Sequence, residues 1–191
     1  MIKNLLAAAE RGAARAQFIL GNMHHNGTGV PQDYAKAARL YRLAAEQGYA
    51  KAQHNLGVMY KNGWGVAQDD AEAVRLYRLA AEQGYAKAQY NLGLMYDNGE
   101  GVAQDFAEAV RLYRLAAEQG HAKAQSNLGF MYGTGQGVPQ NYVLAHMWFN
   151  LAAAQGVEDA AGNRDIVAGR MTPADSSEAQ RLAREWLEAH Q

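Results

Sequence analysis

Glycine recurs along this chain with a fixed step of 36 residues, in two separate series. The first series is Gly12, Gly48, Gly84, Gly120 and Gly156, and the second is Gly21, Gly57, Gly93 and Gly129. Tyrosine, methionine and paired alanines recur with the same step. A period of about 20 to 50 residues indicates small structural units that stack on their neighbours, because one unit cannot bury its own apolar face. The sequence therefore predicts a repeat array.

Each unit predicts two helices joined by a loop. In residues 86–98, small and apolar residues recur at three- and four-residue steps, namely Ala88, Leu92, Met95 and Tyr96. Residues 106–119 show a second such stripe, formed by Ala109, Leu112, Tyr113, Ala116 and Ala117. This spacing places each set on one side of a helix. We call these segments the first and the second helix of a repeat.

Short polar motifs mark the ends of these helices. Asp69 with Glu72, and Asp105 with Glu108, have the spacing of a capping box, in which each residue binds the backbone N–H of the other. Thr172 with Asp175 has the same spacing, and proline follows the threonine. Gly120 is expected to end the second helix in a left-handed conformation.

The repeat boundaries predict a single all-α domain over residues 1–191, an α-solenoid with capped ends. Its parts are an N-terminal half repeat (2–12), four full repeats (13–48, 49–84, 85–120 and 121–156) and a pair of C-terminal capping helices (157–191). After Gly156 the repeat pattern is no longer visible. The last helix has an apolar face predicted from Ala179, Leu182, Trp186 and Leu187, and we expect this face to close the core.

Composition excludes several classes of function. Lysine plus arginine (18) nearly balances aspartate plus glutamate (19), so no broad attraction to nucleic acid or to an acidic membrane is expected. The absence of cysteine excludes disulfides and thiolate metal ligands. Near the start, only residues 5–9 form an apolar run, which is too short for a membrane span. We expect a soluble protein, cytoplasmic as the sequence stands, or periplasmic or secreted if a signal peptide has been removed.

The repeat pattern resembles the Sel1-like repeats, which are relatives of the tetratricopeptide repeats. The resemblance covers residues 13 to about 156 and rests on AxAxxxLGxMYxxGxGV followed by an aspartate and by a run such as AVRLYRLAAEQG. His24 and Asn141 depart from the pattern, where the other units have tyrosine and aspartate. The resemblance implies a right-handed superhelix that acts as an adaptor or scaffold for other proteins, often in bacterial signalling, envelope or host-interaction systems. It names no partner.

The glycine pairs of the loops are interpreted as turns and not as phosphate-binding loops. A dinucleotide-binding loop follows a β-strand, whereas each GxG here follows a predicted helix. The residue between the glycines changes from one copy to the next, as Thr28, Trp64, Glu100 and Gln136. Trp64 is a candidate contact with a partner, and packing against its own repeat is the alternative.

Residues that change between copies are the best candidates for recognition, because the recurring residues build the framework. Four such positions lie on one side of each first helix at steps of three, four and three. They are Arg15, Phe18, Asn22, His25; Lys51, His54, Val58, Lys61; Lys87, Tyr90, Leu94, Asp97; and Lys123, Ser126, Phe130, Gly133. We call them the first-helix face. In the related tetratricopeptide repeats these positions line the concave surface, which predicts a groove for a peptide or a helix of another protein.

Recurring polar residues and ionisable groups offer no catalytic or metal site. The recurring asparagines and glutamines, such as Asn55 and Gln53, could bind a peptide backbone, or could satisfy neighbouring repeats. The histidines lack metal-ligand spacing, and no serine begins an SxxK motif. We therefore expect no catalytic residue, metal or cofactor. Two alternatives stay open: cell-wall-related ligand binding or weak β-lactamase-like activity, and self-assembly of a monomer by weak end-to-end association.

Overall fold

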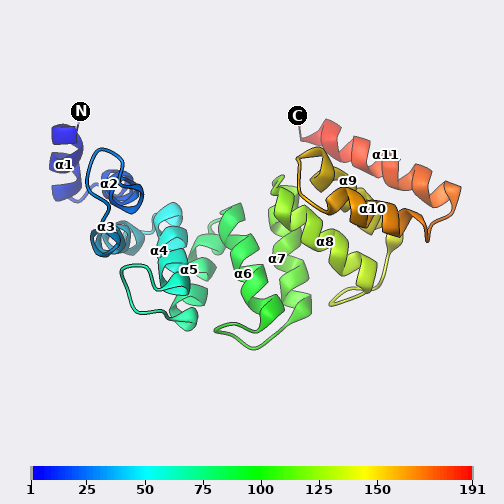
Figure 1. Cartoon of the computed structure of the whole chain (residues 1–191), viewed down its shortest axis with the longest axis horizontal. Helices are drawn as coiled ribbons and strands as arrows, with labels where there is room; N and C mark the ends of the chain where they lie inside the picture. The colour runs from blue at the N-terminus through cyan, green and yellow to red at the C-terminus, as the bar shows by residue number, and fades with distance from the viewer. Residues whose placement is uncertain (1, 191) are drawn as a thin grey trace. The chain divides into compact units, whose positions relative to one another are not determined.

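The structure, a computed structural model, describes residues 2–190, and within them it contains eleven helices and no strand (Figure 1). The helices are α1 (Ile2–Glu10), α2 (Ala14–Asn26), α3 (Tyr34–Glu46), α4 (Ala50–Asn62), α5 (Asp70–Glu82), α6 (Ala86–Asn98), α7 (Phe106–Glu118), α8 (Ala122–Thr134), α9 (Tyr142–Ala154), α10 (Ala160–Ala168) and α11 (Pro173–Ala189). The predicted all-α repeat solenoid is confirmed. Among the helices described, none combines the length and the apolar character needed to span a bilayer.

The contacts within the chain divide it into two compact units. Unit 1 runs to Met95 and also includes Gly99–Ala103, so it holds α1 to α5 and most of α6. Unit 2 comprises Tyr96–Asn98 and the chain from Gln104 onwards, which holds the last turn of α6 and α7 to α11. The first helices are α2, α4, α6 and α8, and the second helices are α3, α5, α7 and α9. The predicted N-terminal half repeat forms α1, in the place of a second helix.

A glycine and a tyrosine bring the two helices of a repeat close together. Tyr41 of α3 is fully buried beside Gly21 of α2, where a Cβ atom would lie 2.7 Å from the ring. Tyr77 and Gly57 repeat this arrangement at 2.8 Å. Small alanines around the rings, such as Ala52, allow the close approach, and leucine and methionine fill the remaining space. This explains why glycine recurs inside the first helix.

At the start of the second helices, one of the two hydrogen bonds of the predicted capping box is present and the other is absent. Asp69 accepts a hydrogen bond from the Glu72 N–H at 2.9 Å, which is a standard N-cap. The Glu72 carboxylate, however, binds Arg75 at 2.7 Å, and the Asp69 N–H donates to the carbonyl of Tyr60. The reciprocal box predicted at Asp69 is therefore wrong, because another acceptor already binds that N–H.

The same half-box occurs in the next repeat. Asp105 caps α7, while the Glu108 side chain binds Arg111. The capping box of Thr172 and Asp175 at the start of α11 is complete, as predicted.

The glycine-pair loops are turns that rest on the preceding repeat. Gly63 and Gly65 have φ angles of 67° and 68°, a left-handed conformation that favours glycine. A Cβ atom on Gly65 would lie 2.3 Å from the backbone of Tyr34 at the start of α3. The loop can therefore approach the backbone of the previous repeat only with glycine at this position.

The C-terminal helices end the array in unit 2. α10 takes the place of a fifth first helix, although the sequence pattern fades there, and α11 packs on α9. The buried side of α11 is formed by Ala179 and Ala183, with Trp186 against Trp148 of α9. Leu187 was expected on this side but is exposed, so that part of the predicted apolar face is wrong.

Candidate functional site

The first-helix face is shared between the two units, so each part is a separate surface. Unit 1 carries its positions from Arg15 to Leu94, and unit 2 carries Asp97 and the positions on α8. The basic residues that open this face are exposed on every first helix, namely Arg15, Lys51, Lys87 and Lys123. The other positions vary in exposure from one repeat to the next.

His54 does not belong to the accessible part of this face. Its side chain is only 8% exposed, and its ring lies between Tyr77 and Tyr85 at centroid distances of 5.8 and 5.3 Å. Its two nitrogens lie 3.1 and 3.0 Å from the side chains of Asn55 and Asn91. His54 therefore packs between repeats, where a partner cannot reach most of its side chain.

Two other residues on this face of unit 1 are also engaged within the protein. Phe18 is half-buried and lies 5.1 Å from the ring of Tyr49. Asn22 accepts hydrogen bonds from the hydroxyl of Tyr41 at 2.7 Å and from Asn55 at 3.2 Å. Fewer side chains than predicted are thus available to a partner in unit 1.

Half-buried apolar residues remain further along α4 and α6, namely Val58, Tyr90 and Leu94. Burial raises the pKa of Tyr90, so its hydroxyl stays protonated near neutral pH. These side chains keep part of their surface accessible, which fits a shallow apolar contact.

The recurring glutamines bind neighbouring helices. Gln53 donates to the carbonyl of Ala45 at 3.2 Å and accepts from Gln83 at 2.7 Å. The side chain of Gln17 makes the equivalent bonds one repeat earlier, with Ala9 and Gln47. The sequence predicts that these amides bind either a peptide backbone or a neighbouring repeat, and the structure supports hydrogen bonding between neighbouring repeats.

In two of the four loops, the middle residue contacts the first-helix face of the preceding repeat. Trp64 stacks on Tyr34, with centroids 5.8 Å apart and the planes inclined by 17°, and it also contacts His25. Glu100 takes the same place one repeat later and binds Lys61 at 2.6 Å. Trp64 is partly exposed but lies against the preceding repeat, so packing accounts for most of its ring.

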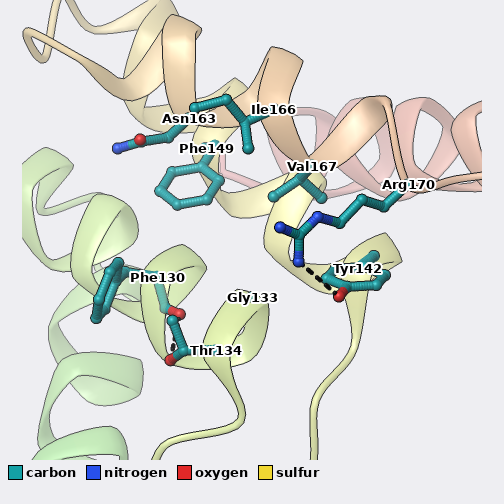
Figure 2. Close-up of a pocket in the computed structure, with 9 residues that line it drawn as sticks. All are labelled: Phe130, Gly133, Thr134, Tyr142, Phe149, Asn163, Ile166, Val167 and Arg170. Atoms are coloured by element: carbon teal, nitrogen blue, oxygen red, sulfur yellow. Dashed lines mark hydrogen bonds between the residues drawn. The ribbon is translucent and has the colours of Figure 1, made fainter.

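Unit 2 contains an apolar pocket between α8, α9 and α10 (Figure 2). Phe130 of α8 is 51% exposed and Ile166 of α10 is 64% exposed, the two largest exposures among the bulky apolar side chains described. The pocket has a volume of about 180 Å³, and its lining is Phe130, Gly133, Thr134, Tyr142, Phe149, Asn163, Ile166, Val167 and Arg170. Large apolar side chains exposed around a concave site are typical of a binding surface.

Polar groups lie at the edge of this pocket. Arg170 donates a hydrogen bond to the hydroxyl of Tyr142 at 3.1 Å, and its guanidinium lies 5.8 Å from the centre of that ring (Figure 2). Asn163 and Ile166 reach the pocket from α10. An apolar centre with a few polar groups around it can hold one bulky side chain and orient the backbone next to it.

The 36-residue step of the sequence continues into this site. Ile166 follows Phe130 by 36 residues, and Asn163 follows Asn127 by the same step. Because the predicted array ends at Gly156 and residues 157–191 are predicted as caps, the predicted site does not include these two residues. Arg170 follows α10, where no repeat pattern is visible.

Other residues of the first-helix face in unit 2 offer little chemistry. Asp97 accepts a hydrogen bond from Tyr113 at 2.9 Å, and Ser126 is half-buried. Gly133 lines the pocket without a side chain. In the described part of the chain, no group of three or more histidine or acidic residues has a geometry that could hold a metal ion.

The fold is an α-helical repeat array, and its unit 2 contains an apolar pocket. The sequence profile of the Sel1 repeat matches residues 14–49, 50–85, 86–121 and 122–157, which is most of the chain. The chain therefore belongs to the Sel1 repeat family. Proteins of this family generally mediate protein–protein interactions, and they are generally non-enzymatic.

Solved structures show the same fold. A protective antigen of uropathogenic Escherichia coli strains is 46% identical to this chain, with a TM-score of 0.79. The match covers 82% of this chain and only 33% of the antigen. A Sel1 repeat protein from Oxalobacter formigenes is 34% identical, with a TM-score of 0.79 over 98% of this chain and 74% of its own.

A more distant structure is the cysteine-rich protein B of Helicobacter pylori, 27% identical with a TM-score of 0.52 over 68% of this chain and 96% of its own. The comparison with curated proteins found no match.

Proposed function

We propose that this protein is a non-enzymatic scaffold that binds a peptide or a helix of another protein on its first-helix face. In unit 2 the pocket between Phe130 and Ile166 takes one bulky apolar side chain of the partner. The observation that carries the proposal is the exposure of these two side chains on either side of a pocket, since water contact with so much apolar surface is unfavourable unless a partner covers it.

The edge of the pocket supports the same function. Anchor pockets at interfaces combine an apolar centre with polar groups that fix the orientation of the partner. Asn163 can accept and donate hydrogen bonds to a peptide backbone, and Arg170 adds a positive charge. The partner segment is thus expected to place a carboxylate close to its apolar anchor.

The first helices support a partner with acidic residues. Each of them begins its exposed face with a basic residue, namely Arg15, Lys51, Lys87 and Lys123. Charges of one sign along a surface speed the approach of a segment of the opposite sign. In unit 1, Tyr90 and Leu94 offer a further apolar contact.

The test compares capture of partners by wild-type protein and by two variants, followed by mass spectrometry and by direct affinity measurement on the partner found. Phe130→Ala with Ile166→Ala should weaken binding by tenfold or more, because loss of an anchor costs about 2 to 4 kcal/mol. Tyr90→Ala tests the contact in unit 1. Leu115→Ala is the matched control, since Leu115 is also exposed but lies on the second helix α7.

This comparison decides whether the partner binds to the first-helix face. A partner that is retained by Leu115→Ala and lost with the pocket variant supports the proposal. Equal affinity of the pocket variant, the Tyr90 variant and the wild type for every partner would place binding elsewhere on the protein.

A further inference from the structure

In unit 1 a groove lies between α1 and α3, which occupy second-helix positions, and residues of α2 complete its lining. It has a volume of about 650 Å³, and its apolar lining includes Leu6, Ala9, Leu20, Leu40 and Leu43. Leu6 and Leu43 stand on its two sides and are each 39% exposed. None of these residues belongs to the first-helix face, so this groove is separate from the proposed peptide site.

The groove is a recurring feature of the array. A second groove lies between α3 and α5, and its lining residues follow those of the first by 36 positions, as Ala45 follows Ala9 and Leu79 follows Leu43. Leu79 is 37% exposed, much like Leu43. Stacking of second helices therefore leaves a furrow between each pair of them in unit 1.

In unit 2 the corresponding furrow, between α7 and α9, is filled by a helix of the protein itself. Leu151 follows Leu43 by three repeats and is only 1% exposed. Trp186 of α11 lies against Trp148 of α9, and its ring reaches Gly120, the counterpart of Gly48 in the groove between α3 and α5. An amphipathic helix with one large aromatic side chain is thus the occupant that fits this kind of furrow.

The α1–α3 groove differs from the other furrows in its charge. Arg75 and Arg111 each form an ion pair with a glutamate three residues earlier, at 2.7 and 2.6 Å. In the first repeat the residue that corresponds to the glutamate is Lys36, which forms an ion pair with Asp33 at 3.3 Å, and none of the described carboxylates forms an ion pair with Arg39. The lining of the α1–α3 groove thus holds two basic residues, Lys36 and Arg39, and one acidic residue, Glu10, whereas two arginines and two glutamates line the second groove.

From these observations we propose that the α1–α3 groove is a second docking site, which binds an acidic amphipathic helix of a partner protein. A large apolar side chain of that helix lies between Leu6 and Leu43, in the way that Trp186 lies against α9. A carboxylate of the same helix pairs with Arg39.

A peptide with the sequence of α11, residues 172–190, is a suitable probe. It carries the tryptophan, and its four acidic residues outnumber its two arginines. Binding of the fluorescein-labelled peptide to the full chain is followed by fluorescence anisotropy. We expect saturable binding that weakens at high salt and weakens about tenfold or more when alanine replaces tryptophan in the peptide.

Two variants of the protein locate the binding. Leu43→Asp should weaken binding by tenfold or more, because it places a charge at the apolar contact. Lys36→Glu gives Arg39 the glutamate partner that Arg75 has, so it should weaken binding while leaving the fold intact even if Leu43→Asp fails to fold. Phe130→Ala should leave peptide binding unchanged, which separates this site from the proposed first-helix site.

Three results would overturn the proposal: no saturable binding, binding that Lys36→Glu and Leu43→Asp leave unchanged, or binding that only Phe130→Ala reduces. Sedimentation velocity of the full chain tests a second copy as the occupant. If the wild type forms a dimer and the Leu43→Asp variant does not, the groove binds a second copy of this chain, and the proposal of a partner helix is overturned.

Discussion

A helical glycine lies in close contact with a buried aromatic ring in three of the four repeats. The pairs Gly21–Tyr41, Gly57–Tyr77 and Gly129–Phe149 all leave too little room for a Cβ atom, which would lie 2.7, 2.8 and 3.0 Å from the ring. Glycine inside a helix costs about 1 kcal/mol relative to alanine. The fold accepts this cost because the two helices can then pack at short range.

Gly57→Ala is predicted to destabilise the protein although alanine favours the helix. Its methyl group would meet the buried ring of Tyr77, and overpacking of this kind costs about 1 to 3 kcal/mol. Gly162→Ala in α10 is the matched control, because a Cβ atom there meets nothing within 4 Å. The control should gain about 0.5 to 1 kcal/mol. Urea denaturation measures both, and a Gly57→Ala variant as stable as wild type would contradict the packing argument.

His146 is predicted to make stability depend on pH. It is buried in α9, its Nδ1 has no hydrogen-bond partner, and burial together with nearby Arg164 lowers its pKa in the folded state, against a smaller opposite effect of Asp165. The unfolded chain therefore binds a proton more readily, and stability should fall as the pH drops below about 6.5.

The variant His146→Val tests this dependence, because valine occupies the same place in the two preceding repeats, as Val74 and Val110. We expect its free energy of unfolding to change less between pH 7.5 and about 5 than that of the wild type. Equal slopes for the two proteins would assign the acid sensitivity to other groups.

At the scale of helices, α9 and α11 show how the array is closed. The second helices α3, α5 and α7 carry lysine or glutamate where α9 has Leu144, and arginine where it has Met147. Met147 is buried, and α8, α10 and α11 all pack on α9. The same leucine position that is exposed in α3 and α5 becomes buried in α9.

Trp186→Ala is predicted to loosen α11. Its ring packs against Trp148 and stacks on His190, and its removal exposes the apolar side of α9. Because Trp186 is only half-buried, the free energy of unfolding should fall by at most about 3 kcal/mol, which is the lower end of the range for replacing a buried tryptophan by alanine. Leu187→Ala, at an exposed position next to it, should cost much less. Thermal unfolding by circular dichroism compares the two variants, and equal losses would argue against the packing of α11 on α9.

At the scale of the whole molecule, contacts are confined to neighbouring helices and gather into two units. In a repeat array, a change in one repeat affects its neighbours first, because stability is a sum of local terms.

Amide hydrogen exchange tests whether the two units respond separately. Gly57→Ala is predicted to raise exchange in α4 and α5 of unit 1 more than in α8 and α9 of unit 2, and Trp186→Ala should do the reverse. Equal increases along the whole chain for either variant would show that the protein unfolds as one cooperative body.

The 36-residue period alone determined the helices, their order and the solenoid class, since apolar spacing and recurring glycines depend only on local geometry and on stacking of equal units. The N-caps also followed from the sequence, but the partner of Glu72 did not. Arg75 binds the Glu72 carboxylate, and the carbonyl of Tyr60 accepts the Asp69 N–H that the predicted box assigned to Glu72.

Only the tertiary structure decided which variable residues are accessible. His54 and Phe130 occupy the same predicted face, yet one is buried between tyrosines and the other borders a pocket. Leu43 and Leu151 are the same residue at the same repeat position, yet Leu43 is exposed and Leu151 is buried in α9, on which α10 and α11 pack. Helical periodicity gives the side of a helix on which a residue lies, whereas burial depends on what packs against that side, and segments distant in the sequence provide that packing.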